Sequence, residues 1–329
     1  MLAPFNVPDF LSNQLCTDLN GYLGSKSALD DNGKLVDLRI WFQCLVKKVL
    51  KPEEERVPDG NPYLWYEMTC FTYWYHPHRC RVLCIGTPDT LRERLQAVLN
   101  KPRPLNLGDP LAMLDPLLNE IIQLYDESTW RARDAVRAIE ENRLKRRPDF
   151  MTMHEISRHT SHVVETESVA IEAIESLLQR QEALHQTLPT ELGNGYLVQA
   201  RERLSFQLQM MKSLKWRSLS TQERLNAEVN VAYNMIASQD SVVIKSIAFL
   251  TMAFLPATFV STVFSTTFFS FGEDKWKTSN QFWIYWAVVI PSTLLVLLSW
   301  WLWLENWTRI SNFSGIACGK RRNLSSRPV

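Results

Sequence analysis

The sequence predicts an α-helical membrane protein with two transmembrane helices, an N-terminal cytosolic α/β plus helical domain, and a long stalk helix that continues into the first span. Two apolar runs, residues 246–272 and 282–304, indicate the transmembrane helices, because each exceeds the roughly 20 residues that cross the hydrocarbon core of a bilayer. The stalk is indicated by the absence of proline and glycine between Tyr196 and Pro256. A single helix can therefore continue through this whole stretch.

The composition gives no bias toward a nucleic-acid partner, because the formal net charge of the 329 residues is only +1. The N-terminal sequence MLAPFNVPDF lacks the basic and apolar regions of a secretory signal peptide, so we expect the N-terminal part to stay in the cytosol. The six cysteines have no metal-binding spacing, and we expect them to be reduced packing residues. No enzyme motif is present, and no enzymatic activity is expected.

The N-terminal part, residues 1–107, is predicted to form a small α/β subdomain. Its first segment, residues 1–30, is weakly periodic, and we expect loops or a short helix there. Residues 36–48 and 63–75 are rich in aromatic and β-branched side chains. This composition favours strands, and a polar stretch with turn dipeptides separates the two segments.

A hairpin and a short helix complete this predicted subdomain. Residues 64–86 have two strand-like segments around a proline turn, so we expect an antiparallel hairpin. The helix that follows is expected to have Thr87 as its N-cap and Pro88 as its first residue, since these residue types are preferred at those positions.

Residues 108–194 are predicted to form an antiparallel helical hairpin, with helices over 111–147 and 150–185. His159 and His162 share a face of the second helix, and we expect both to be solvated. Acidic side chains also gather on this helix, either as a solvated face, the usual meaning of such a pattern, or as a regulatory cation site. These side chains are Glu165, Glu167, Glu172 and Glu175.

The predicted stalk covers residues 195–241, and the first transmembrane helix covers 242–271. An outer loop, the second transmembrane helix and a basic cytosolic tail are expected over 272–281, 282–304 and 305–329. Basic residues flank the spans on the side of both termini, whereas the two lysines of the loop are balanced by two acidic residues. The positive-inside rule therefore places both termini in the cytosol.

Apolar residues of the stalk keep a heptad spacing. A helix of this length is expected to find little to bury against within its own domain, so the spacing favours self-association along the stalk. The residues that keep the spacing are Leu204, Leu208, Met211, Leu225, Val229, Ala232 and Ile236.

One stripe of the first span has a pattern typical of a pore wall. Steps of three and four residues place hydroxyls toward the outer end and an apolar side chain further in, a combination that suits permeation and gating. The alternative is that these hydroxyls bond to preceding carbonyl groups or pack small faces together. The stripe consists of Ile244, Ala248, Thr251, Leu255, Thr258, Thr262 and Ser265.

Residues 254–271, FLPATFVSTVFSTTFFSF, together with the charged helix before them, resemble the signature of CorA-family magnesium channels, especially fungal CorA-like proteins. The second span, QFWIYWAVVIPSTLLVLL, is similar to theirs as well, so that the resemblance covers about residues 195–304. It implies a homopentamer with a stalk helix that continues into the pore helix and a second span packed outside it. By family role, Leu255, Thr258 and Thr262 line the pore, and the stalk holds regulatory magnesium sites.

The sequence departs from the family at the selectivity-filter position. Family members carry Gly-Met-Asn at the outer end of the first span, where this chain has Ser265, Thr266 and Thr267. In the family, the asparagine and nearby carbonyl groups hold a hydrated cation through its water molecules, which suits magnesium because it dehydrates reluctantly. Glu273 and Asp274 in the outer loop form the candidate outer mouth, where they concentrate cations.

These observations predict passive flux of magnesium or a related divalent cation through a homopentameric pore. The expected partners are further copies of the chain, the lipid bilayer and divalent cations, with magnesium both as the transported ion and as a regulatory ligand. The membrane is either the plasma membrane or an internal membrane. Because Gly-Met-Asn is missing, the alternative is a non-conducting, membrane-anchored CorA-like scaffold or a subunit that modifies intact channels.

Overall fold

The computed structural model divides the chain into two compact units, Met1–Ala232 and Tyr233–Val329. The long helix α5 (Asn194–Ser265) contributes residues to both units, and each unit is described by itself. The described residues are 5, 7–8, 19–51, 54, 60–75, 79–100, 105–143, 147–188, 192–265, 269–272, 275–278 and 283–302.

The N-terminal unit contains an antiparallel sheet whose strands follow the chain order β1-β2-β3-β4. Strands β2 (Leu35–Val49) and β3 (Tyr63–Tyr75) form where the aromatic and β-branched composition predicts them. The pairing of β3 with β4 (Arg79–Ile85) confirms the predicted hairpin. The chain therefore builds this sheet from neighbouring segments joined by short connections.

The prediction of loops or a short helix over residues 1–30 was wrong for residues 21–29, which form strand β1 (Gly21–Leu29). Its sequence, GYLGSKSAL, has glycines and small polar residues that are poor strand formers on their own. The strand forms because it pairs along its length with β2. Gly24 lies opposite Trp41, and a Cβ atom there would collide with the Trp41 indole. The glycine that obscures the strand in the sequence is thus what lets Trp41 pack.

Helix α2 (Asp89–Leu99) begins one residue later than expected, with Pro88 rather than Thr87 as its N-cap. Pro88 has an extended backbone, with φ −66° and ψ 150°, so it precedes the helix. Its carbonyl oxygen accepts hydrogen bonds from the backbone N–H groups of Leu91 and Arg92. The absence of an N–H group on proline is compatible with this position as well.

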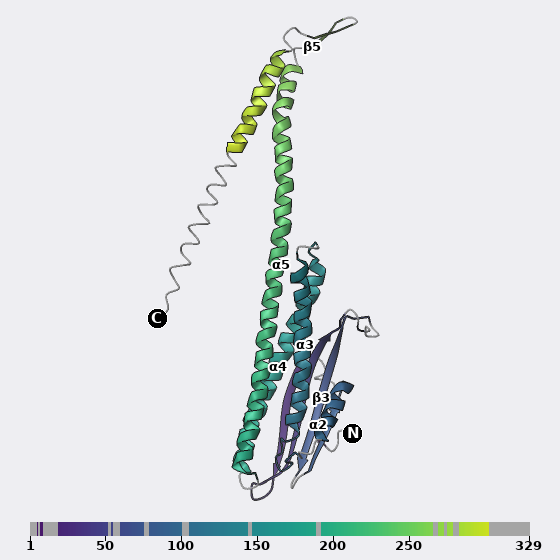
Figure 1. The fold of residues 1–329 in the computed structure, drawn as a ribbon, viewed down its shortest axis with the longest axis vertical. Coiled ribbons are helices and arrows are strands. Elements are labelled where there is room, and N and C mark those ends of the chain that lie inside the picture. The colour runs from purple at the N-terminus through teal and green to yellow at the C-terminus, as the bar shows by residue number, and fades with distance from the viewer. Residues whose placement is uncertain are drawn as a thin grey trace, which may run out of the picture. The chain divides into compact units, whose positions relative to one another are not determined.

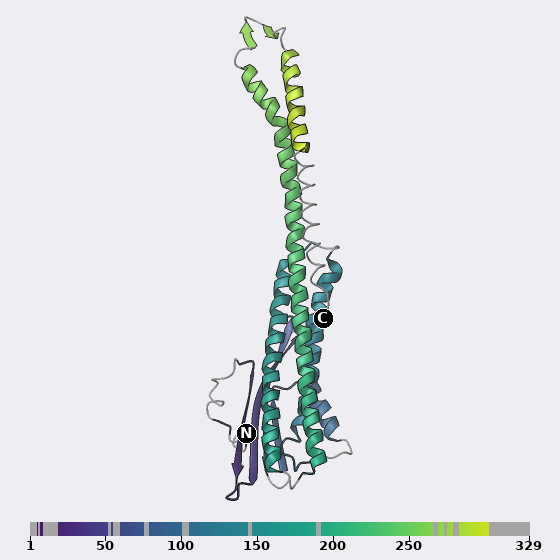
Figure 2. The same cartoon turned by 90° about the vertical axis from the view of Figure 1, so that its left-hand side faces the viewer.

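Helices α3 (Leu114–Asn142) and α4 (Phe150–Thr187) occupy the segment predicted as a helical hairpin, and both lie against the sheet. Figures 1 and 2 show the sheet and the helices as two layers. The Tyr125 hydroxyl of α3 donates a hydrogen bond of 3.0 Å to the Leu45 carbonyl oxygen of β2. The α4 N-cap is Asp149, whose carboxylate accepts bonds from two backbone N–H groups. The apolar core lies between the two layers.

The first part of α5 completes this helical layer. Leu204 and Met211 are buried in the same core, and the Gln207 side chain donates a 2.8 Å hydrogen bond to the Asp115 carboxylate of α3. Ala232, further along the predicted heptad stripe, is also buried. The expectation that this stripe finds little to bury against was wrong for Leu204, Met211, Leu225 and Ala232, which are buried, whereas Ile236 at its end is exposed.

In the C-terminal unit, α5 continues through Pro256 and ends at Ser265, earlier than the expected end of the first span at residue 271. Strand β5 (Phe269–Gly272) occupies the predicted end of the first span, and it pairs antiparallel with β6 (Lys275–Thr278), which lies in the predicted outer loop. The second apolar helix is Trp283–Leu302. The predicted tail over 305–329 lies outside the described residues.

Candidate functional site

The predicted stripe lies on the part of α5 that belongs to the C-terminal unit. Its side chains are exposed in the single chain, except for Ala248, which is half-buried. Both apolar helices are long and apolar enough to cross a membrane, yet only 6% of each apolar stretch is buried within the chain. Apolar surface of this extent needs a bilayer or other protein to cover it.

The hydroxyl groups of the stripe turn their hydrogens back toward their own helix. This is the hydrogen bonding that the sequence leaves open as an alternative to a pore wall. A hydroxyl group has one hydrogen and two acceptor sites. Because these hydrogens are used within the helix, the hydroxyls of the stripe can only accept further hydrogen bonds. The four donors and their acceptors are Thr251 to the Ile247 oxygen at 2.9 Å, Thr258 to the Phe254 and Leu255 oxygens at 3.0 Å, Thr262 to the Phe259 oxygen at 2.7 Å, and Ser265 to the Thr262 oxygen at 3.3 Å.

The second apolar helix packs on a different face of α5. The rings of Phe249 and Trp300 contact each other, with centroids 5.8 Å apart, and Pro256 and Val260 are buried. At about 100° per residue, Phe249, Pro256 and Val260 lie roughly 120° to 160° around the helix from Ile244. The stripe therefore faces away from these three positions.

One polar contact joins the two apolar helices at the side of the stripe. The Ser261 and Tyr285 hydroxyl oxygens lie 2.9 Å apart. Ser261 is thus engaged with the second helix, whereas the hydroxyls of its neighbours Thr258 and Thr262 are bonded within α5. This difference separates a hydroxyl that joins helices from the hydroxyls that are candidates for lining a pathway.

The outer end of the stripe is described only at Ser265, the last residue of α5. The other two selectivity-filter residues, Thr266 and Thr267, lie outside the described residues, as do Glu273 and Asp274 of the predicted outer mouth.

The glutamate face of α4 divides into two kinds of position. Glu165 and Glu172 are exposed, and Glu175 forms an ion pair of 2.6 Å with Lys212 of α5. The expectation that Glu167 belongs to a solvated face was wrong, because its side chain is fully buried where α3, α4 and α5 meet. Among the described residues, no three His, Cys, Asp or Glu side chains are placed to hold a metal ion within one chain.

The buried Glu167 carboxylate is held by hydroxyl groups from the neighbouring helices. Its Oε1 atom lies 2.7 Å from the Thr129 hydroxyl of α3 and 3.0 Å from the Ser218 hydroxyl of α5. Burial raises the pKa of Glu167 from its ordinary 4.5 to about 7, against the opposing effect of these hydrogen bonds. The helical period alone could not indicate this burial, since it places Glu167 among four acidic side chains of one helix.

His159 and His162 share a face of α4 as expected, but His159 is not solvated. It is buried against the edge of the Tyr63 ring, and burial lowers the pKa of His159 from 6.5 to about 4. The Nδ1 atom of His162 lies 2.8 Å from Nζ of Lys47, which also lies over the rings of Tyr63 and Trp65. The cluster joins α4 to the sheet.

Four cysteines are described as free thiols, namely Cys44, Cys70, Cys80 and Cys84. They pack in or against the core, which agrees with the expectation of reduced packing residues. The other two cysteines of the chain, at positions 16 and 318, lie outside the described residues.

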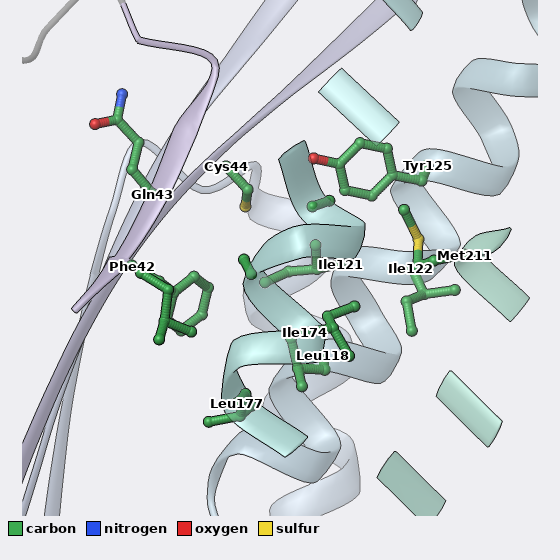
Figure 3. Close-up of a pocket in the computed structure, with 13 residues that line it drawn as sticks. Phe42, Gln43, Cys44, Leu118, Ile121, Ile122, Tyr125, Ile174, Leu177 and Met211 are labelled. Carbon is green, nitrogen blue, oxygen red and sulfur yellow. The ribbon is translucent and has the colours of Figure 1, made fainter. Parts of the chain in front are cut away.

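The core also contains an apolar cavity between the sheet and the helices, drawn in Figure 3. Phe42 and Cys44 line it from β2, and Ile121, Tyr125 and Ile174 line it from the helices. Its volume of about 30 Å³ is close to the share of one water molecule in the liquid. It is a packing gap and is too small for an organic ligand.

Comparisons with known proteins agree with this architecture. Residues 81–304 match the family model described as "CorA-like Mg2+ transporter protein". The chain is 36% identical over 280 residues to the notoamide biosynthesis cluster protein M' of Aspergillus versicolor, covering 73% of this chain and 60% of that protein. The chain thus spans less than two thirds of the length of this curated relative.

Two solved structures have the same fold at low sequence identity. The full-length CmaX protein gives a TM-score of 0.53 at 14% identity, covering 91% of this chain and 81% of that chain. The CorA magnesium transporter of Methanocaldococcus jannaschii gives 0.51 at 13% identity, covering 83% and 77%. These likenesses confirm the predicted fold class, an N-terminal α/β domain with a long helix and two apolar helices consistent with two spans.

Proposed function

Because the chain belongs to the CorA-like Mg²⁺ transporter family, we propose that it passes magnesium or a related divalent cation through a membrane, by passive flux through a homopentameric pore lined by α5. The observation that carries this proposal is the hydroxyl stripe. Its hydrogens point back into the helix, its oxygens are left as acceptors, and it faces away from the ring contact between Phe249 and the second helix.

The chemistry of the stripe suits a hydrated cation. Magnesium keeps its water ligands tightly, so a pathway that holds those waters is easier to enter than one that must strip them. The water molecules around a cation point their hydrogens outward. They can donate hydrogen bonds to the hydroxyl oxygens of Thr251, Thr258 and Thr262. In five copies each position becomes a ring of acceptor oxygens. Leu255, exposed on the same face, becomes an apolar ring that can close the pathway by excluding water.

The entrance of the proposed pore lies at Ser265, Thr266 and Thr267. Hydroxyl oxygens at these positions would replace the amide oxygen of the family motif, with shorter reach toward the axis. Glu273 and Asp274 would attract cations to the mouth, and the neighbouring lysines of the loop weaken that attraction. We therefore propose an entrance that is less selective for magnesium than one built with Gly-Met-Asn.

The proposal also assigns a membrane topology. Both termini lie in the cytosol, and the membrane is the plasma membrane or an internal one. The partners are further copies of this chain, the lipid bilayer and divalent cations. Protease digestion of sealed vesicles that expose the cytosolic side tests the topology, because the tail over 305–329 should be removed from the outside.

Flux into liposomes tests the function. Purified full-length protein should raise the signal of a magnesium-sensitive dye inside the vesicles. Thr258→Val keeps the shape of the side chain but removes its oxygen, and we expect flux to fall severalfold. Ser261→Ala is the matched control, because this hydroxyl is engaged with Tyr285, and flux should be kept. Equal flux in both variants and the original protein would contradict the assigned pore face.

A second function is favoured by one observation, the replacement of Gly-Met-Asn by Ser-Thr-Thr at 265–267. The chain would then be a non-conducting, membrane-anchored scaffold or a subunit that modifies conducting relatives. Restoring Gly-Met-Asn at these positions separates the two functions. Flux only after the restoration, together with co-purification of the original chain with an intact relative, would support the second function over the first.

A further inference from the structure

Strands β3 and β4 place two cysteines directly opposite each other. Cys70 of β3 is the cross-strand partner of Cys84 of β4, and both thiols are free. Directly opposed residues of an antiparallel pair have Cα atoms about 4.5 or 5.5 Å apart. Both separations lie within the roughly 4.4–6.8 Å that a disulfide bond spans. The backbone therefore allows the two sulfur atoms to bond without moving either strand.

The two thiols differ in exposure and in pKa. Cys84 has the properties of a cysteine that reacts first with an oxidant, and Cys70 those of the cysteine that then forms the disulfide bond with it. Cys84 lies on β4, the last strand in the sheet order, and is only partly buried, whereas Cys70 is fully buried in the core. Their proximity lowers the pKa of Cys84 and raises the pKa of Cys70 well above its usual value. A partly exposed sulfur with increased thiolate character is the more reactive one.

We propose that Cys84 and Cys70 form a reversible disulfide bond when the protein meets hydrogen peroxide. This modification is independent of ion transport. The Cys84 thiolate attacks one peroxide oxygen, the O–O bond breaks, and the departing hydroxide takes up a proton to become water. Cys84 is then a sulfenic acid.

The second step closes the bond. The Cys70 thiol gives up its proton, its sulfur attacks the Cys84 sulfur, and the S–O bond breaks as hydroxide leaves with that proton as water. In sum, two thiols lose two electrons and two hydrogens, and one peroxide becomes two water molecules. A cellular thiol such as glutathione reverses the reaction by exchange.

The same strand supplies an internal control. Cys80 is also partly buried and also lies on β4, but its cross-strand partner is Trp74. Burial raises the pKa of Cys80 from 9.0 to about 11. Cys80 thus has comparable exposure without a thiol opposite it, and it should react more slowly.

The consequence of the disulfide bond is a covalent link across the edge of the sheet. Strand β4 is held to the sheet only by β3 in the described topology, and α2 begins shortly after it at Asp89. The bond between Cys70 and Cys84 would prevent β4 from separating from β3. Oxidation would therefore slow the local opening of β4.

The experiment uses the full-length protein in detergent micelles, reduced and then exposed to hydrogen peroxide. Remaining thiols are alkylated, and the digested protein is analysed by mass spectrometry. We expect a peptide pair cross-linked through Cys70 and Cys84, lighter by two hydrogens, which separates again after treatment with dithiothreitol. Cys84 should lose its free thiol faster than Cys80, because Cys84 has a thiol opposite it and the greater thiolate character.

Three variants make the outcome decisive. Cys70→Ser should leave Cys84 as a sulfenic acid that dimedone labels, and Cys70→Ala serves if the serine variant does not fold. Cys80→Ser should form the bond at the original rate. The proposal is overturned if Cys84 reacts no faster than Cys80. It is overturned equally if the cross-link joins other cysteines or forms only after denaturation.

Discussion

Replacing Glu167 by Gln should make the helical layer of the N-terminal unit more stable at pH 8 than the original protein, while the two remain similar at pH 5. Burial raises the pKa of this carboxyl group to about 7, compared with 4.5 for an ordinary glutamate. The unfolded chain ionises first, so the stability of the original protein falls as the pH rises from about 4.5 through 7. The cost at pH 8 exceeds that at pH 5 by about 2.5 kcal/mol.

The hydrogen bonds to Glu167 oppose the rise of its pKa, but the Thr129 hydroxyl cannot give its full support to the carboxylate. The Thr129 hydroxyl lies 2.9 Å from the Tyr125 carbonyl oxygen and 2.7 Å from Oε1 of Glu167, yet it has a single hydrogen. A carbonyl oxygen can only accept. The two acceptors must share this hydrogen, which weakens both bonds, whereas a glutamine amide turned with its nitrogen toward Thr129 supplies a hydrogen of its own at every pH.

Hydrogen exchange of α4 peptides, compared between variant and original protein at the same pH, gives the measurement. The intrinsic exchange rate cancels in this comparison. We expect the protection ratio of variant to original to rise roughly 60-fold from pH 5 to pH 8, the factor that corresponds to about 2.5 kcal/mol. Glu172→Gln, an exposed change on the same helix, should leave the ratio constant. A constant ratio for Glu167→Gln as well would refute the reasoning.

Three further predictions concern the same unit and use the full-length protein. Asp149→Ala removes the side-chain N-cap of α4 and should cost about 1 kcal/mol, measured as faster exchange in the first turn of α4; unchanged exchange would contradict the capping role. Gly86→Ala should destabilise the β4–α2 connection by about 1 kcal/mol or more, because φ is +71° and a Cβ atom would collide with the Glu67 carbonyl oxygen; a melting temperature equal to the original would show that the turn relaxes. Burial lowers the pKa of His159 from 6.5 to about 4, so its contribution to stability is present above pH 6.5 and is lost as the pH falls toward 4. His159→Asn should therefore reduce the drop in melting temperature between pH 7 and pH 5. An equal drop in the variant and the original protein would show that other groups cause the acid sensitivity.

Local composition was sufficient to predict most helices and strands. It was insufficient for segments whose structure depends on pairing with a neighbouring strand. The aromatic and β-branched residues of β2 and β3 fit a pleated surface wherever they occur, so their strands could be predicted. Strand β1 could not, because Gly24 is required by the indole of Trp41 on the neighbouring strand. The end of α5 at Ser265 was equally unpredictable, since the apolar run continues into β5, whose structure depends on its pairing with β6.

For the candidate site, helical period predicted the stripe but could not show what lies beside it. That Phe249 contacts the second helix on another face of α5 depends on how two spans pack. The burial of Glu167 depends in the same way on three helices meeting. The pairing of Cys70 with Cys84 depends on the register of a hairpin. In each case the decisive information is a contact between segments, and it is not contained in either segment alone.

The central claim is that one face of α5 lines a cation pathway, and cysteine substitution along that face tests it most directly. Full-length Thr258→Cys protein in liposomes would be assayed for magnesium flux with and without cadmium, which binds thiolates strongly. The account predicts that cadmium blocks flux in Thr258→Cys, but not in Ser261→Cys or in the original protein with its native cysteines. Equal block at both positions, or flux that cadmium does not change at Thr258→Cys, would contradict it.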